Sequence, residues 1–335
     1  MPSTSAPTAL PRFRRRWAAV AGLMVLSPIS AEYLIGYGES RPLELLVGLL
    51  VLAPLYGSVA VLIREITRRT GRGWPTILLL SAAFGVIQAG LIDQSLFNYE
   101  VHAGDPDWAN EPQHTLISGL GVDAASLLTY VGGHVIWSFA APIAVVESCA
   151  ARIADRRWLG RAGLSAMAAL WALGAVLVHL DAAADSTASA VQLSGAALVA
   201  AALIAAAFTV WPAHHPSSSR APSWRLVGTV TGVAWGASQL LPATWLGLTV
   251  NVATLVVLGR LLLRWARSQG WGRSHMLAAA GSALVVRAAL SFLVEPLAGG
   301  TGAVKYAVNA IMLAGVTVLL YLAARRLHRE EPSTF

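Results

Sequence analysis

Apolar stretches of about 20 residues recur along the chain from Trp17 to Ala324, separated by short polar segments. A helix of about 20 apolar residues is long enough to cross the hydrocarbon core of a bilayer. The pattern therefore predicts an all-α, polytopic transmembrane helix bundle with ten spans. The expected spans are 17–37, 43–63, 74–97, 123–148, 162–184, 188–211, 224–241, 245–263, 275–297 and 304–324.

The composition agrees with this class of protein. Of the 335 residues, 56% are hydrophobic and 12% are charged, whereas soluble domains have about 25% charged residues. The single cysteine, Cys149, excludes an internal disulfide. No CxxC, HExxH, P-loop or GxGxxG motif occurs, so neither a metal nor a cofactor is expected.

The 24 basic residues lie in clusters between the predicted spans. All of them except Arg41, Arg287 and Lys305 fall on one side of the expected topology. The positive-inside rule places that side, and with it both termini, in the cytoplasm of a bacterial inner membrane. Clustering of this kind argues against nucleic acid as the partner for the formal charge of +7. The expected partners are the lipid bilayer and a small-molecule or lipid substrate, and no feature specifies an oligomeric state.

Two segments, 68–91 and 267–290, align without gaps and suggest an internal repeat. Parallel repeats are a common architecture in membrane proteins, and binding sites often lie at the repeat interface. The alignment pairs Gly71 with Gly270, Gly73 with Gly272 and Gln88 with Arg287. The predicted organisation is a basic N-terminus (1–16), a first four-helix unit (17–148) with an outer loop (98–122), two linking spans (149–223), a second four-helix unit (224–324) and a tail (325–335).

Ionisable and amide side chains lie within several spans, where lipid should exclude them. Such residues usually face the bundle interior, and they mark either a functional site or an ion pair. His134 and Ser138 are four residues apart and so share a helix face, and Arg287 is expected to pair with a carboxylate. We predict an outward-opening polar pocket that binds a substrate or an ion, with a purely structural polar network as the alternative. The pocket residues are Glu32, Gln88, Asp93, His134, Ser138, Arg287 and Glu295.

The stretches LYGSVAVLIREITRRTGRGWPTILLLSAAFGVIQAGLIDQSLFN and HVIWSFAAPIAVVE resemble uncharacterised polytopic membrane proteins of actinobacteria. A fainter similarity is to the CPBP-type intramembrane peptidases, the CAAX-processing and bacteriocin-protecting family. That family has a Glu-Glu pair followed by arginine, then Phe-x-x-x-His, then His-x-x-x-Asn. Each motif is incomplete here, and the matching positions are Glu65 and Arg69, Phe84 and Gln88, and His134 and Ser138.

The incomplete motifs argue against an active peptidase of this type. Gln88 stands where the family has histidine, and glutamine does not act as a base at neutral pH. Glu65 is expected at the cytoplasmic end of the second span, beside several arginines and outside the bundle. The resemblance therefore implies an inactive or repurposed relative.

Three functions remain open. The first, ranked narrowly ahead, is an ion-coupled small-molecule carrier or binding protein, in which Glu32, Asp93 and His134 bind a cation or carry protons. The second is a membrane-embedded enzyme acting on a lipid, prenyl or peptide substrate, with Glu32 or Asp93 as general acid or base and His134 as its partner. The third is a non-catalytic assembly subunit that uses its acidic outer loop as a contact surface.

Overall fold

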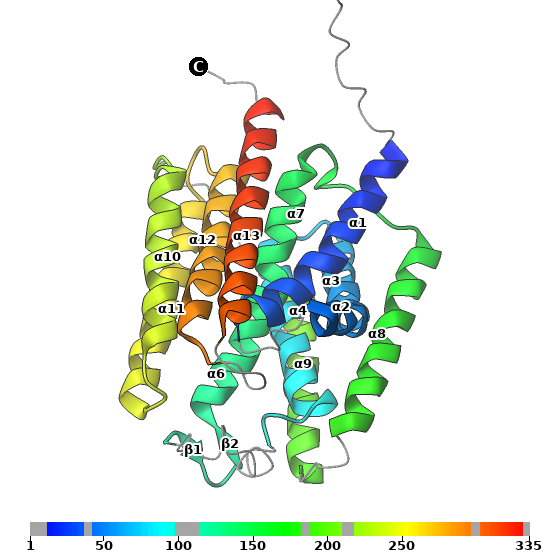
Figure 1. Cartoon of the computed structure of the whole chain (residues 1–335), viewed down its shortest axis with the longest axis vertical. Coiled ribbons are helices and arrows are strands. Elements are labelled where there is room, and N and C mark those ends of the chain that lie inside the picture. The colour runs from blue at the N-terminus through cyan, green and yellow to red at the C-terminus, as the bar shows by residue number, and fades with distance from the viewer. Residues whose placement is uncertain are drawn as a thin grey trace, which may run out of the picture.

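The computed structural model describes residues 12–36, 42–97, 114–182, 188–209, 218–295 and 302–330. In these ranges the chain forms ten helical stretches at the positions of the ten predicted spans, which confirms the all-α bundle (Figure 1). Parts of the predicted N-terminus, outer loop, linking segment and tail lie outside the described residues, namely 1–11, 98–113, 183–187, 210–217 and 331–335.

The first four stretches are helices that a π-helical turn either interrupts or ends. A short antiparallel hairpin of β1 (Leu116–Ile117) and β2 (Val122–Asp123) precedes the fourth stretch. The stretches are α1 (Arg12–Pro28) with η1 (Ile29–Tyr33), then α2 (Pro42–Leu52), η2 (Ala53–Gly57) and α3 (Ser58–Arg69), then α4 (Trp74–Ile87) with η3 (Gln88–Ile92), and finally α6 (Ala124–Gly133), η4 (His134–Ala140) and α7 (Ala141–Cys149).

The remaining stretches follow a short 3₁₀ turn, η5 (Ala151–Ile153). Within the described ranges, eight helical stretches are long and apolar enough to cross a membrane. The other two are α10, which has 17 residues, and α1 with η1, which begins in the arginine cluster. The later helices are α8 (Arg161–Ala182), α9 (Ala190–Thr209), α10 (Trp224–Leu240), α11 (Trp245–Ala266), α12 (Arg273–Leu290) with η6 (Ser291–Leu293), and α13 (Ala303–Glu330).

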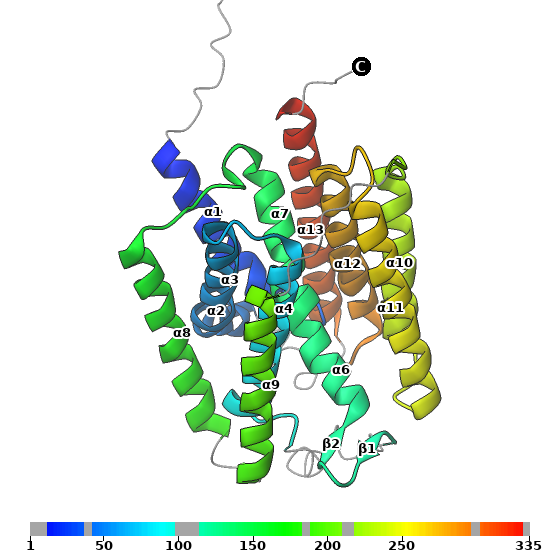
Figure 2. The same ribbon diagram turned by 180° about the vertical axis from the view of Figure 1, so that it is seen from behind.

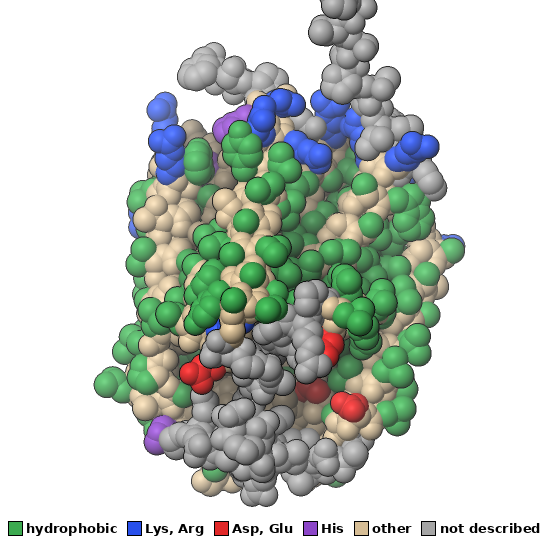
Figure 3. All heavy atoms as spheres, in the orientation of Figure 1, with side chains coloured by type: hydrophobic (Ala, Val, Ile, Leu, Met, Phe, Trp, Pro, Cys, Tyr) green, Lys and Arg blue, Asp and Glu red, His purple; other side chains and the backbone are tan. Residues whose placement is uncertain are grey.

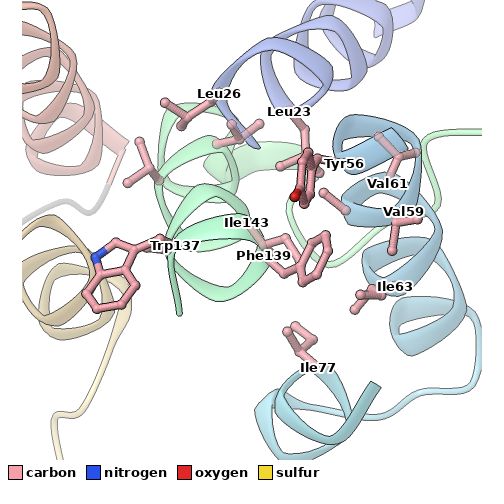
Figure 4. Close-up of a cluster of buried hydrophobic side chains, with 14 of the residues drawn as sticks. Leu23, Leu26, Tyr56, Val59, Val61, Ile63, Ile77, Trp137, Phe139 and Ile143 are labelled. Atoms are coloured by element: carbon pink, nitrogen blue, oxygen red, sulfur yellow. The ribbon is translucent and has the colours of Figure 1, made fainter. Parts of the chain in front are cut away.

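The helices form two groups that lie side by side (Figures 1 and 2). We call α1–α4, α6 and α7 the first unit and α10–α13 the second unit. The linking helices α8 and α9 pack on the first unit, α8 against η2 and α3 and α9 against α4. Helix α7 joins the two units because it packs against both α12 and α13. Several of the most buried apolar side chains lie in the first unit, among them Leu55, and Figure 4 shows Leu23, Phe139 and Ile143 in the same cluster.

Lysine and arginine side chains gather at the end of the bundle where α1 begins and α13 ends (Figure 3). We call this the basic end, and we call the opposite end, which carries β1 and β2, the hairpin end. Between the two ends, the exposed side chains of α8, α9, α11 and α13 are largely apolar, as expected for surfaces that face lipid.

The turns between α3 and α4 and between α11 and α12 each contain two glycines of similar conformation. Gly71 and Gly270 both have positive φ angles, of 67° and 81°, in the left-handed region that glycine adopts without strain after a helix. Gly73 and Gly272 are both extended residues that precede the next helix. The two pairs of glycines aligned in the sequence thus have similar backbone conformations, and the internal repeat stays a prediction.

Candidate functional site

The fourth span changes character at its midpoint. No residue of α6 is buried, whereas the eight residues of α7 from Ala141 to Ser148 are all buried. The π-helical turn η4 lies between these two halves. The half at the hairpin end is thus partly exposed, and the half at the basic end lies in the core.

The sequence around Pro142 explains why the helix is irregular here. Proline has no N–H to donate to the carbonyl four residues earlier, which is that of Ser138. The N–H of Ala141 donates to Ile136 five residues earlier, so it does not bond the carbonyl of Trp137. Two adjacent carbonyls inside the bundle therefore lose their usual helical donors.

Two serines of the first span supply the missing donors. The Ser27 hydroxyl donates to the carbonyl of Ser138 at 2.6 Å, and the Ser30 hydroxyl donates to the carbonyl of Trp137. Both serines are completely buried. Because buried carbonyls need partners, these serines stabilise the π-helical turn and connect the end of α1 and η1 to η4.

All four π-helical turns in the described ranges lie in the first four spans. Such turns are rare and are frequent at functional sites. Two of the predicted pocket residues begin such turns, Gln88 in η3 and His134 in η4. The irregular backbone therefore coincides with polar residues selected from the sequence alone.

Gln88 and Asp93 form a hydrogen-bonded pair at the end of the third span. The amide nitrogen of Gln88 donates to the Asp93 carboxylate at 3.0 Å, and the other carboxylate oxygen accepts from the backbone of Ser95 at 2.9 Å. Gln88 is 1% exposed, and its amide oxygen has no hydrogen-bond partner among the described residues. A buried acceptor of this kind costs about 1–3 kcal/mol when unsatisfied.

His134 and Ser138 also contact each other, as their spacing predicts. The Nδ1 atom of His134 lies 3.2 Å from the Ser138 hydroxyl. The His134 ring packs among aromatic side chains from η2, α4 and η4 itself, with centroid distances of 5.5 Å to Tyr56, 6.2 Å to Phe84 and 6.4 Å to Phe139. His134 thus lies in an aromatic environment with one hydroxyl contact.

The other predicted pocket residues are more dispersed. The Arg287 guanidinium lies 4.4 Å from the centre of the Trp137 ring, so it is placed over an aromatic face that favours a cation. Its expected pairing with a carboxylate stays a prediction. Glu32 is partly buried in η1, and Glu295 is exposed beyond η6.

A cavity of about 530 Å³ lies between the two units, along α6 and η4 on one side and α10 and α11 on the other. Its volume falls within the usual range of small-molecule sites. Trp137 and Trp235 meet edge to face in its wall, with centroids 5.2 Å apart. Trp137 points away from Phe139, toward the second unit (Figure 4). η4 therefore presents His134 to the aromatic cluster and Trp137 to the cavity.

The polar side chains that line the cavity lie toward the hairpin end. The Ser238 hydroxyl donates to the Asn251 amide oxygen at 2.6 Å, and Gln239 and Thr129 line the same region. The rest of the wall is apolar, and no charged side chain of the described residues lines it. This site could not be recognised in the sequence, because its residues are common types and the two sides of the cavity come from distant spans.

A buried ion-pair network at the basic end was also missed. Arg64 and Glu65 are completely buried, and Arg64 contacts Glu65 at 2.5 Å and Glu147 at 3.0 Å. Arg68 binds both oxygens of Glu147, at 2.9 and 2.6 Å. The prediction that Glu65 lies outside the bundle is therefore wrong. Helix α3 continues to Arg69, so Arg64, Glu65 and Arg68 lie on a helix that packs against α7 and not in a loop.

The segment that follows α7 folds over this network. The Glu65 carboxylate accepts hydrogen bonds from the backbone of Trp158 at 2.8 Å and of Leu159 at 3.3 Å. The Arg64 guanidinium stacks 3.6 Å from the Trp158 ring and donates to the carbonyl of Ala154. These contacts satisfy the buried charges with several partners each, as burial of charge requires.

This arrangement separates the residues that resemble the peptidase motifs. Glu147 lies in the same cluster as Glu65 but 13 residues beyond His134, which is about 20 Å along a helix. Phe84 does lie beside His134, but Glu65 does not join them. The peptidase-like constellation is therefore not assembled.

The two units also meet at the basic end. Arg273 at the start of α12 forms an ion pair with Asp155, and Arg326 of α13 donates to the carbonyl of Cys149 at 3.2 Å. The side chains of Asp155 and Arg273 are 76% and 36% exposed, and such exposed pairs contribute only about 0–1 kcal/mol. The units are thus in contact at the basic end and separated by the cavity nearer the hairpin end.

Among the described residues, no three His, Cys, Asp or Glu side chains come together in a way that could hold a metal ion. A family model described as an uncharacterized membrane protein family matches residues 22–334. No curated protein and no solved structure matches the chain. The family match spans both units and every residue of the predicted pocket.

Proposed function

Because the chain belongs to an uncharacterized membrane protein family, we propose from its own geometry that it is a carrier or binding protein for a small amphipathic molecule. The observation that supports this most directly is the cavity between the two units. Binding sites at the interface of parallel repeats are common in membrane carriers. The positive-inside rule supports a basic end in the cytoplasm and a hairpin end outside.

The lining of the cavity indicates the chemistry of the ligand. Ser238, Gln239 and Asn251 offer uncharged hydrogen-bonding groups near the hairpin end. The apolar and aromatic wall beyond them suits a hydrocarbon body. A charged ligand would lack a compensating charge and would be costly to bury there. The ligand is therefore an uncharged amphiphile whose polar group points toward the hairpin end.

Binding is tested with 1-monooleoylglycerol, an uncharged amphiphile with two hydroxyl groups, by native mass spectrometry of the full-length protein in detergent. We expect a one-to-one complex, with affinity about fivefold weaker in Asn251→Leu because one neutral hydrogen bond is lost. Thr249→Val is the matched control, since Thr249 is exposed on the same helix and bonds its own backbone. Absence of the complex, or equal affinities for Asn251→Leu and wild type, contradicts the proposed site.

The two faces of η4 provide a route for proton coupling. Protonation of His134 would place a charge inside the bundle, where its polar contact is the uncharged Ser138 hydroxyl. Because burying a charge there is unfavourable, the charged ring would favour a displaced η4, and Trp137 on the same turn would move with it. His134 is therefore proposed as the residue that couples a proton to the cavity.

Uptake of monooleoylglycerol into proteoliposomes, measured across a range of pH, tests this coupling. We expect His134→Gln to remove the pH dependence while the protein still binds ligand. His179→Gln is the control, because His179 lies on α8 and contacts the carbonyl of Ile92 outside η4. An unchanged pH profile in His134→Gln would show that His134 does not couple the proton.

A further inference from the structure

The second unit contains another concave surface, separate from the cavity between the units. A groove of about 580 Å³ lies among α10, α12 and α13 and is reached from the basic end. Small residues form its floor, among them Gly228, Ala278, Gly281 and Ala324. Larger side chains at these positions would fill it, so the depression follows from the small residues on three adjacent helices.

The groove has the length of one bilayer leaflet. Along α12 its lining extends from Ser274 to Val285, a separation of eleven residue steps, which corresponds to about 16 Å of helix. Half of a hydrocarbon core of about 30 Å is about 15 Å. An acyl chain that enters at the membrane surface would therefore fit along the groove as far as the middle of the bilayer.

The mouth of the groove is basic and polar. Arg225, Ser274 and His328 line it where α10 and α12 begin and α13 approaches its end. Arg325 lies beside them, with its guanidinium 5.6 Å from the ring of Tyr321, which also lines the groove. No Asp or Glu of the described residues lines it. Basic pockets between membrane helices are typical binding sites for anionic lipid headgroups.

We propose that this groove binds an anionic phospholipid from the leaflet at the basic end. The phosphate contacts Arg225, Ser274 and His328, and one acyl chain lies against the small residues of α12 and α13. Charge decides the class of ligand, because a mouth with basic groups and no lining carboxylate favours an anionic over a zwitterionic headgroup. The site is independent of the proposed carrier function, since it shares no lining residue with the cavity between the units.

The test uses full-length protein in nanodiscs of phosphatidylcholine that contain a small fraction of phosphatidylglycerol. The lipids that the protein retains after extraction are quantified by mass spectrometry. We expect enrichment of phosphatidylglycerol in wild type and about fivefold less in Arg225→Gln, the effect of one basic side chain near an anionic headgroup. Arg260→Gln is the matched control, an exposed arginine near the same end that does not line the groove.

A second pair of variants tests the acyl-chain part of the site. Ala324→Phe fills the groove and is expected to abolish the enrichment, whereas Ala310→Phe on an exposed part of the same helix leaves it unchanged. Equal loss in Arg225→Gln and Arg260→Gln would overturn the proposal, because it would indicate general attraction to basic residues. Two other results would also overturn the proposal: enrichment of phosphatidylglycerol that persists in Ala324→Phe, and loss of bound phosphatidylglycerol on addition of inorganic phosphate. Either result shows that the groove does not hold the acyl chain.

Discussion

Replacement of Glu147 by alanine tests the ion-pair network at the basic end. Glu147 is the shared partner of Arg64 and Arg68, with contacts of 3.0 Å to Arg64 and of 2.6 and 2.9 Å to Arg68. Its side chain is only 7% exposed, so water cannot replace the carboxylate. Glu65 would remain as the one carboxylate of the cluster beside the arginines of α3.

The expected loss follows from the cost of leaving a buried charge without its partner. Breaking a buried ion pair by removing one member costs about 3–5 kcal/mol, and Glu147→Ala should lower the free energy of unfolding by that amount. Glu147→Gln should cost less because it keeps a hydrogen-bond acceptor. Asp155→Ala is the control, since it removes a carboxylate from the exposed pair with Arg273, a pair that contributes about 0–1 kcal/mol.

The assay is reversible unfolding in mixed micelles, by titration with a denaturing detergent and detection by circular dichroism. The reasoning is refuted if Glu147→Ala is no more destabilising than Asp155→Ala. That result would mean that water reaches the arginines and that the network does not hold α3 against α7.

Three further predictions concern packing, capping and the π-helical turn. Gly57→Ala should destabilise the fold by about 1–3 kcal/mol, because the added methyl would lie 2.6 Å from the Cα of Met24. Gly195→Ala is the control, since the space around Gly195 is open. Equal destabilisation by the two substitutions would contradict the close helix contact at Gly57. Burial opposes ionisation of Asp123, which precedes the span Ala124–Cys149, but hydrogen bonds from Ser126 and Thr115 hold its pKa below the ordinary 3.8. The ionised carboxylate therefore stabilises the fold above the pKa that Asp123 has in the unfolded chain, and this stabilisation is lost as the pH falls through its lower pKa in the folded protein. The free energies of unfolding of wild type and Asp123→Asn should accordingly converge at low pH and differ at higher pH. A difference that does not change with pH would rule this out. Replacing Ser27 by alanine leaves the carbonyl of Ser138 without that donor and should cost about 1–3 kcal/mol in the same unfolding assay, and a neutral effect would show that another donor satisfies it.

The positions of the helices could be predicted from the sequence because a membrane span is a local property. Twenty apolar residues are recognised wherever they occur, and the ten stretches lie where the hydrophobic pattern places them. The turn glycines were also recognisable, since Gly71 and Gly270 occupy matching positions and share a positive φ. The contact of His134 with Ser138 followed from spacing along one helix. The pairing of Gln88 with Asp93 did not, because residues five apart diverge on an ideal α-helix, and these two meet across the π-helical turn η3.

Contacts between distant segments could not be predicted in this way. The burial of Glu65 depends on Glu147 and on the backbone at Trp158, residues more than 80 positions away. An arginine-rich segment at a span end resembles a solvated loop until its partners are known. The cavity likewise depends on how α6 packs beside α10 and α11. One signal was available, because Pro142 inside a span implies a freed carbonyl and hence a donor such as Ser27.

The most direct test of the central claim is thiol labelling at the cavity between the two units. In a Cys149→Ser background, which removes the single native cysteine, Thr129→Cys places a thiol on the lining near the hairpin end, and Thr249→Cys places one on an exposed surface outside the cavity. The measurement is the rate of labelling by a thiol reagent with and without 1-monooleoylglycerol. The account predicts that the amphiphile slows labelling at position 129 and leaves position 249 unchanged. Equal rates at position 129 with and without the amphiphile would contradict it.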